Sequence, residues 1–249
     1  MDLGLSGRVA IVTGGSRGIG RAIAKMLASE GVDVAICARQ RQALEEAAKT
    51  LSQETGRRII PIVADTMSSE SVAQLVDMTM KTFGRVDVLV NNASTPGGMV
   101  RGPLAEANDK TLLEDIDTKV VGYLRCAKAV APHMQQRRWG RIINIGGLSG
   151  RRSGNISGLR NAAIVHLTKT LADELGAHGI TVNLVHPGTT RTERTDAETE
   201  RRAATNAIRR IVDASEIAQV VTFLASTKAA NVTGVAIDAS GGSIPVMFQ

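Results

Sequence analysis

Three glycines near the start of the chain have spacings that suit a phosphate site. Gly14, Gly18 and Gly20 follow an apolar, β-branched run at residues 8–12 and precede a segment of helical apolar spacing at residues 22–27. A strand, a glycine turn and a helix in this order bring the backbone close to a ligand, and the free amides of the helix start attract a pyrophosphate. A purely structural turn is the alternative for this pattern alone. The predicted cofactor-binding residues of the turn are Gly14, Ser16, Arg17, Gly18, Ile19 and Gly20.

The residues after the second predicted strand favour NADP(H) over NAD(H). A carboxylate there would bond the ribose hydroxyls and repel a 2′-phosphate, but the chain has Ala38 followed by Arg39. Arg39 and Arg17 offer two guanidinium groups that can hold a phosphate. We therefore predict NADP(H) as the cofactor. A solvated loop charge is the alternative interpretation of Arg39.

The composition indicates one α/β domain over residues 1–249. Because 43% of the residues are hydrophobic but only 2% are aromatic, the core must be aliphatic. The net charge of +6 is scattered over the chain without interleaved aromatic residues, so nucleic-acid binding is not expected. A modest positive field instead favours a phosphorylated cofactor.

Neither a metal site nor a membrane span is expected. The four histidines are far apart in the sequence, and no apolar run approaches the roughly 20 residues of a spanning helix. The first residues carry no apolar signal core. Cys37 and Cys126 lie in apolar surroundings, which is typical of a reducing compartment. The predicted location is the cytoplasm.

Strands and helices alternate along almost the whole chain. The strand segments are nearly continuously apolar, as in a sheet covered on both faces. With right-handed crossovers this predicts a Rossmann-like, doubly wound parallel sheet with helices on both faces. Strands are expected at residues 8–12, 32–37, 59–64, 86–90, 141–145, 180–185 and 235–238, and helices after the glycine turn and at residues 40–55, 68–83, 112–134, 159–176 and 215–224.

These elements and their motifs identify a family resemblance. The chain resembles the short-chain dehydrogenase/reductase family over essentially its whole length, and in particular members like the 3-oxoacyl-(acyl-carrier-protein) reductases. The motifs that carry the resemblance are residues 13–20, Asp65, residues 87–93, Asn144, residues 182–188, Thr233-Gly234 and Gly241-Gly242.

The resemblance implies alcohol–carbonyl chemistry with a nicotinamide cofactor, a small-molecule carbonyl or alcohol substrate and a homotetramer or homodimer. It places Asp65 at the adenine and Asn91 and Ala93 along the cofactor, although Ser94 stands where a glycine is usual. At the nicotinamide end, the implied residues are Pro187, Gly188, Thr190 and Thr192.

The catalytic positions of the family do not match this chain. The family uses a tyrosine, a lysine four residues later, a serine at the end of the fifth strand and an asparagine on the preceding helix. Alignment through residues 167–172 puts Ser157 at the tyrosine position and Asn161 at the lysine position. Gly147 then replaces the serine, and Lys119 replaces the asparagine. None of the four positions therefore has the residue type that the family uses there. Lysine stands at the asparagine position, and asparagine stands at the lysine position.

Lys119 and Asn161 suggest a substitute arrangement. Our hypothesis is that Lys119 reaches across the cleft and supplies positive charge near the nicotinamide ribose, while Asn161 bonds a hydroxyl. A surface lysine left over from lost function is the alternative. Ser157 alone is a poor proton donor because the pKa of an unassisted hydroxyl is far too high.

Other groups near the predicted cleft were considered for proton transfer. His186 ends the sixth strand and titrates in a useful range, with a histidine bonded to the backbone as the alternative. Tyr123 is expected to lie deeper in the fold, and Ser149 or Ser153 could replace the strand-end serine. Solvated loop charges are the favoured interpretation of Arg151, Arg152 and Arg160, with positive charge for an acidic or acyl-thioester substrate as the alternative. A charged cover over the pocket is expected at residues 192–210.

Two functions are therefore predicted. The first is an NADP(H)-dependent oxidoreductase with the atypical catalytic candidates Lys119, Ser157, Asn161 and His186. The alternative is a catalytically inactive NADP(H)-binding homologue that acts as a regulatory or structural subunit.

Overall fold

The fold is built around one parallel sheet. The computed structural model describes residues 2–100, 102–151 and 154–244, so Arg152 and Ser153 lie outside the described residues. The strands run in the order β3-β2-β1-β4-β5-β6-β9, and every neighbouring pair is parallel. Their bounds are β1 (Val9–Thr13), β2 (Asp33–Ala38), β3 (Ile59–Val63), β4 (Val88–Asn91), β5 (Gly140–Ile145), β6 (Ile180–Pro187) and β9 (Ala236–Ala239).

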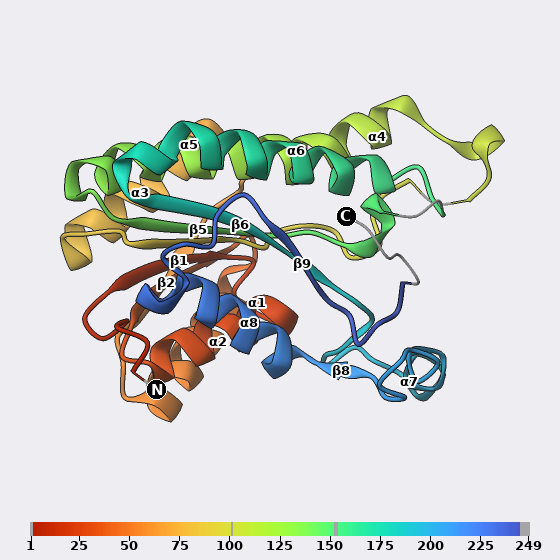
Figure 1. Cartoon of the computed structure of the whole chain (residues 1–249), viewed down its shortest axis with the longest axis horizontal. Helices are drawn as coiled ribbons and strands as arrows, with labels where there is room; N and C mark the ends of the chain where they lie inside the picture. Colours follow the sequence, from red (N-terminus) through yellow and green to blue (C-terminus); the bar gives the residue numbers. More distant parts are fainter. Residues whose placement is uncertain (1, 101, 152–153, 245–249) are drawn as a thin grey trace.

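Helices cover both faces of the sheet, which confirms the predicted doubly wound α/β class. In Figure 1, α1, α2 and α8 lie on one side of the strands, whereas α3, α5 and α6 lie on the other. The helices of the first side are α1 (Gly18–Ser29), α2 (Arg41–Thr55) and α8 (Ala214–Ala225); those of the second are α3 (Ser69–Phe83), α5 (Gly122–Arg137) and α6 (Gly158–Leu175). Short 3-10 turns occur at Leu104–Glu106, Leu148–Gly150, Gly176–His178 and Thr227–Ala229.

Local sequence signals set several helix ends. The Ser68 side chain accepts a hydrogen bond from the Ser71 amide at the start of α3, and Gly56 ends α2 in the left-handed conformation. Aliphatic side chains fill the two layers between sheet and helices, and Ile11, Leu89 and Ile142 are fully buried. The predicted aliphatic core is confirmed.

The strand order places a binding edge between β1 and β4. From β1 the chain proceeds outward to β2 and β3, and then returns to add β4 on the other side of β1. Open α/β sheets bind ligands at this point, outside the carboxyl ends of the strands. The glycine turn follows β1, and Asn92 and Ala93 follow β4.

The long helix expected at residues 112–134 is interrupted. The structure has α4 (Asp109–Ile116), then a π-helical turn at Asp117–Val121, and then α5. A π turn adds one residue to a helical turn and shifts which side chains face inward. Here the wider turn carries Lys119, which is only 2% exposed. Simple helical periodicity does not predict such a turn.

The predicted charged cover at residues 192–210 contains one helix and is flanked by two short strands. The strands β7 (Thr190–Arg191) and β8 (Val212–Asp213) pair in a small parallel sheet, with α7 (Ala197–Ala203) between them. This segment lies at one end of the molecule in Figure 1. Among the described residues, no helix is both long and apolar enough to cross a membrane.

Candidate functional site

A large pocket lies at the carboxyl ends of β1, β4 and β5. Its volume is about 790 Å³, and segments after β2, β3 and β6 complete its walls. Most of the residues predicted to bind a cofactor line this pocket: Gly14, Ser16, Arg17, Gly18, Ile19, Gly20, Arg39, Asp65, Ala93, Pro187, Gly188, Thr190 and Thr192. Lys119, Gly147 and Asn161 line it as well.

The glycine turn has the shape that a close ligand requires. Gly14 and Gly18 have φ angles of +66° and +56°, which a side chain would strain. A Cβ on Gly20 would collide with the carbonyl oxygen of Gly14. The turn therefore requires glycine at these positions, and it lies at the start of α1, where a helix N-terminus attracts anions.

A carboxylate already stands at this helix start. The amide of Gly18 donates a hydrogen bond to Oε2 of Glu193, at 3.1 Å. The carboxylate oxygen stands in for the phosphate oxygen that a helix N-terminus attracts. Glu193 belongs to the charged cover, and the sequence analysis did not single it out. Its contact depends on tertiary folding, since 175 residues separate it from Gly18.

Two arginines give the pocket its positive charge. Arg17 and Arg39 are exposed and line the pocket, and neither forms an ion pair within the part of the chain that the structure describes. Asp65 also lines the pocket, and its Oδ1 accepts a hydrogen bond from the Met67 amide. Arg194, which the sequence analysis did not single out, adds a further guanidinium to the wall.

Asn91 does not lie along the pocket, contrary to the sequence expectation. Its side chain is buried, and Nδ2 donates to Oδ1 of Asn144 at 3.0 Å and to the carbonyl of Tyr123 at 3.3 Å. The next residue, Asn92, lines the wall and ties β4 to the glycine turn by donating to the carbonyls of Thr13 and Gly14. Side chains of a strand alternate between faces, so a shift of one residue changes which asparagine faces the pocket.

Lys119 and Asn161 form the centre of a hydrogen-bonded chain. Nζ of Lys119 donates to Oδ1 of Asn161 at 2.8 Å and to the carbonyl of Gly146 at 2.9 Å. Nδ2 of Asn161 donates to Oγ of Ser149, also at 2.8 Å. The structure thus brings Lys119, Asn161 and Ser149 together on one wall of the pocket. The alternative of a surface lysine is wrong, because Lys119 is 2% exposed.

The environment of Lys119 weakens its hold on a proton. Burial, reinforced by the positive charge of Arg160, lowers the pKa of Lys119 to about 7. Nζ can therefore carry or release a proton near neutral pH, as a general acid must.

Arg160 is not a solvated loop arginine. It pairs with Asp115 at 2.6 Å, and the two side chains are 5% and 0% exposed. Nη2 of Arg160 also donates to the carbonyl of Thr95. Arg151 likewise pairs with Asp238. The expectation of solvated arginines is thus wrong for Arg160, because folding brings Asp115 of α4 against α6.

Ser157 is sealed away from the pocket. It is 2% exposed, and its hydroxyl accepts from the amide of Val100 and donates to the carbonyl of Val100. Gly98 packs so closely that a Cβ there would collide with the Cβ of Ser157. The segment at residues 95–100 therefore fills the space beside Ser157, the position that the sequence alignment predicts for the family's tyrosine. This hydroxyl has no access to a ligand in the pocket.

His186 and Tyr123 are also in structural positions. Nδ1 of His186 accepts a hydrogen bond from the Gly147 amide at 3.0 Å, and burial lowers its pKa to about 4. His186 is 0% exposed and does not line the pocket, so the expectation that it titrates in a useful range is wrong. Tyr123 lies deep in the fold as expected, with its hydroxyl on the carbonyl of Ile145. Burial raises the pKa of Tyr123.

Residues 8–203 match the sequence model of a protein family described as short chain dehydrogenase. A 3-oxoacyl-(acyl-carrier-protein) reductase from Haemophilus influenzae is 36% identical, and the match covers 96% of this chain and 98% of that protein. A peroxisomal 2,4-dienoyl-CoA reductase from Danio rerio is also 36% identical, over 96% of this chain and 82% of that protein.

Solved structures show the same architecture. The L-sorbose reductase from Gluconobacter frateurii, solved in complex with NADPH and L-sorbose, has a TM-score of 0.92 and 30% identity. That match covers 99% of this chain and 100% of the other. An NAD+-bound xylitol dehydrogenase has a TM-score of 0.87 and 29% identity over 96% of this chain and 99% of the other. Proteins similar to this one therefore use either nicotinamide cofactor.

Proposed function

Because this chain belongs to the short-chain dehydrogenase/reductase family, we propose that it is an NADP(H)-dependent oxidoreductase that interconverts a carbonyl and an alcohol. The observation that carries the proposal is the pocket at the glycine turn, with Arg17 and Arg39 on its wall. A small-molecule substrate in the cytoplasm and assembly into a homotetramer or homodimer remain parts of the proposal.

Different residues of the pocket bind different parts of the cofactor. The amides and glycines of residues 14–20 take the pyrophosphate, and binding displaces Glu193 from the Gly18 amide. Arg17 and Arg39 hold the 2′-phosphate, since guanidinium forks match phosphate oxygens. The L-sorbose reductase with NADPH supports this choice by similarity.

Lys119 takes the place of the missing proton donor. Bound NADPH supplies the hydride for a carbonyl carbon. Lys119 holds a proton at Nζ, gives it to the substrate oxygen as that oxygen gains the electron pair of the carbonyl, and regains a proton from solvent. Asn161 fixes Nζ through Oδ1, and Ser149 at the end of the hydrogen-bonded chain orients the substrate oxygen. Two of the three N–H groups of protonated Lys119 are donated to Gly146 and Asn161, so the third serves the substrate oxygen, and the positive charge stabilises bound NADP(H) near the nicotinamide ribose.

A second function is favoured by a different observation. The hydroxyl of Ser157 is engaged by Val100, and Gly147 has no hydroxyl to replace the strand-end serine. A chain that binds NADP(H) without turnover would serve as a regulatory or structural subunit. The two functions share the pocket and differ only in whether Lys119 transfers a proton.

One two-stage experiment tests the cofactor and then the reaction. NADPH and NADH are titrated by fluorescence into the wild type and into the double variant Arg17→Ala/Arg39→Ala. We expect the variant to lose at least about tenfold in NADPH affinity with little change for NADH, because each arginine adds a charge-assisted bond to the 2′-phosphate. Equal loss for both cofactors, or no binding to the wild type, would contradict the NADP(H) site.

In the second stage the loss of NADPH absorbance is followed with ketones, quinones and acyl thioesters. Turnover with one class supports the oxidoreductase and names the substrate class. Binding of NADPH with no turnover in the whole panel would favour the non-catalytic subunit. The matched control is Arg138→Ala, which removes an exposed arginine that bonds the Ala177 carbonyl far from the pocket lining.

A further inference from the structure

A second depression lies at the opposite edge of the sheet, where the strands begin. Its volume is about 500 Å³, and it is lined by Arg8, Arg85, Gln136, Arg137 and Trp139. Arg8 immediately precedes β1, and Arg137 is the last residue of α5. None of these residues lines the pocket at the glycine turn.

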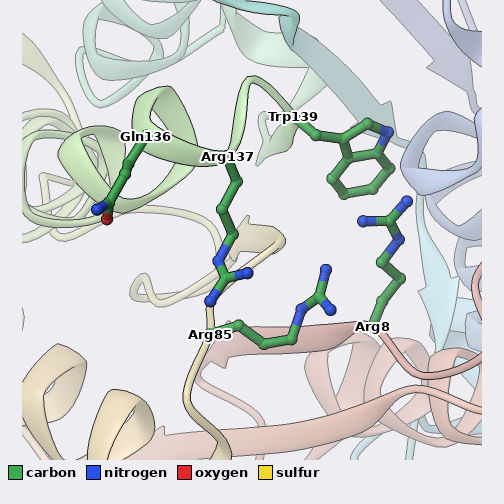
Figure 2. Close-up of a pocket in the computed structure, with 5 residues that line it drawn as sticks. All are labelled: Arg8, Arg85, Gln136, Arg137 and Trp139. Atoms are coloured by element: carbon green, nitrogen blue, oxygen red, sulfur yellow. The ribbon is translucent and has the colours of Figure 1, made fainter.

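Three guanidinium groups converge on this depression from separate segments of the chain. Figure 2 shows the ends of Arg8, Arg85 and Arg137 directed toward one shared space, whereas Gln136 points away from it. Arg85 comes from the loop between α3 and β4. Tertiary folding alone collects these charges, because the residues are far apart in the sequence.

The local charge is strongly positive. Arg8 and Arg85 share the single carboxylate of Asp87, which is fully buried. Arg137 and Arg141 have no carboxylate within ion-pair distance in the part of the chain that the structure describes. Arg141 lies beside Trp139, and burial together with the charge of Arg8 lowers its pKa to about 10. One carboxylate therefore stands against the three guanidinium groups that line the depression, and Arg141 adds a fourth, buried positive charge beside Trp139.

The guanidinium groups are held in place before any ligand binds. Arg85 makes a bidentate pair with Asp87 at 2.6 and 2.7 Å. The Trp139 ring has Arg8 at 3.9 Å and Arg141 at 4.4 Å from its centroid. Arg137 donates to the carbonyl of Gly84 at 2.8 Å, so its remaining donors stay free for a ligand. Side chains fixed in this way lose little entropy when they bind.

We propose that this depression binds a small multivalent anion whose charges are carried by phosphate or carboxylate groups. Arg8, Arg85 and Arg137 hold the anion through charge-assisted hydrogen bonds, and planar guanidinium forks suit both kinds of oxygen. The ligand compensates the positive charge that Asp87 leaves unbalanced. The site is separate from the proposed cofactor pocket and does not depend on turnover.

Calorimetric titration with inorganic pyrophosphate and with citrate, in magnesium-free buffer of low ionic strength, tests the proposal. We expect saturable binding to the wild type and about tenfold weaker binding to Arg137→Gln. This variant breaks no ion pair, so it should fold. The matched control is Arg138→Gln. It removes the same charge at the next residue, whose side chain donates to the carbonyl of Ala177 and does not line the depression. Whichever of the two anions binds more tightly names the ligand chemistry.

A further variant separates this site from the glycine turn. Because the glycine turn is itself proposed to take a pyrophosphate, this comparison uses citrate, and Arg17→Gln is expected to leave the affinity for citrate unchanged. Loss of binding in Arg17→Gln with none in Arg137→Gln would place the anion in the cofactor pocket and overturn the proposal. Equal weakening of anion binding by Arg137→Gln and Arg138→Gln would mean that net charge alone causes the loss, and it would overturn the proposal. Absence of saturable anion binding to the wild type would also overturn the proposal.

Discussion

Lys119 and Asn161 exchange the residue types that the resemblance implies for their two positions, and their contact explains why the exchange is compatible with folding. Nζ of Lys119 lies 2.8 Å from Oδ1 of Asn161, which is a neutral acceptor. A lysine at position 161 would bring two ammonium groups together in a buried site, where like charges repel strongly. The lysine and the asparagine therefore form one unit.

The first prediction at the residue scale concerns the charge on Lys119. Because the pKa of Lys119 is about 7, its ammonium form dominates below neutral pH and is lost as the pH rises. We expect NADPH to bind the wild type several-fold more tightly at pH 6 than at pH 8.5. Lys119→Met should bind NADPH at both pH 6 and pH 8.5 with the lower affinity that the wild type shows at pH 8.5, as measured by fluorescence titration.

Lys128→Met is the matched control, because Lys128 is an exposed lysine on α5. It should retain the affinity and the pH dependence of the wild type. The phosphate of NADPH titrates in the same way in the experiments with Lys119→Met and with Lys128→Met. Only the difference in affinity between these two variants therefore reports on Lys119. An unchanged affinity in Lys119→Met would remove this residue from the proposed site.

At the scale of elements, the segment at residues 95–100 is joined to α6 by several independent contacts. Arg160 of α6 donates to the carbonyl of Thr95, and Ser157 bonds both backbone groups of Val100. Asp115 of α4 accepts from the Met99 amide while it pairs with Arg160. The buried ion pair and the backbone bonds together fix the wall of the pocket beside Ser157.

This packing predicts a large cost for a side chain at Gly98. Gly98 has a φ of +87° and lies against Ser157, so Gly98→Ala combines backbone strain with overpacking. We expect a loss of about 3 kcal/mol in the free energy of unfolding, measured with urea. In a Ser157→Gly background the cost of the same change should fall to about 2 kcal/mol, because the backbone strain and a tight contact of 3.2 Å with Oδ2 of Asp115 remain.

Gly84→Ala is the control for backbone strain. Gly84 has a φ of +74°, but a Cβ there meets no atom within 4 Å. This variant should lose about 1 kcal/mol in either background. If Gly98→Ala proves no more destabilising than Gly84→Ala, the close packing of residues 95–100 on α6 is not present in solution.

At the scale of the whole molecule, the two edges of the sheet have different chemistry. The carboxyl edge carries the glycine turn and the Lys119 group, while the amino edge carries Asp87 and its arginines. Buried β-strands connect the edges, and the sheet core between them is apolar. The assembly into a homotetramer or homodimer stays a prediction that light scattering can test.

Acid stability provides the prediction at this scale. Burial lowers the pKa of His186 to about 4, so the unfolded chain binds a proton that the folded chain excludes. The stability that neutral His186 contributes is present above pH 6.5 and is lost as the pH falls toward 4, by at most about 3 kcal/mol. We expect His186→Asn to flatten the fall of the melting temperature between pH 6.5 and pH 4.

His166→Asn is the control, because His166 is exposed on α6. It should leave the pH dependence of the melting temperature as it is in the wild type. A slope that is the same in all three proteins would mean that His186 gains a proton in the folded state as easily as in the unfolded chain.

Sequence periodicity and glycine spacing were enough to predict the sheet, its helices and the pocket at the carboxyl ends of its strands. Apolar runs bounded by turn residues define strands locally, and the order of β1, a glycine turn and α1 determines where the strand ends meet. These features depend on residues that are neighbours in the chain. The types of Ser157, Asn161, Gly147 and Lys119 likewise lead to the prediction that the usual catalytic set is absent, and this stays a prediction.

Only the tertiary structure decided which side chains meet. It buried Lys119 against Asn161, paired Arg160 with Asp115, placed Glu193 on the glycine turn and collected the arginines beside Trp139. Each of these contacts joins residues from separate elements, and a shift of one residue or a single π turn changes them. Burial then sets the charge states of Lys119 and His186, and burial is a property of the folded molecule.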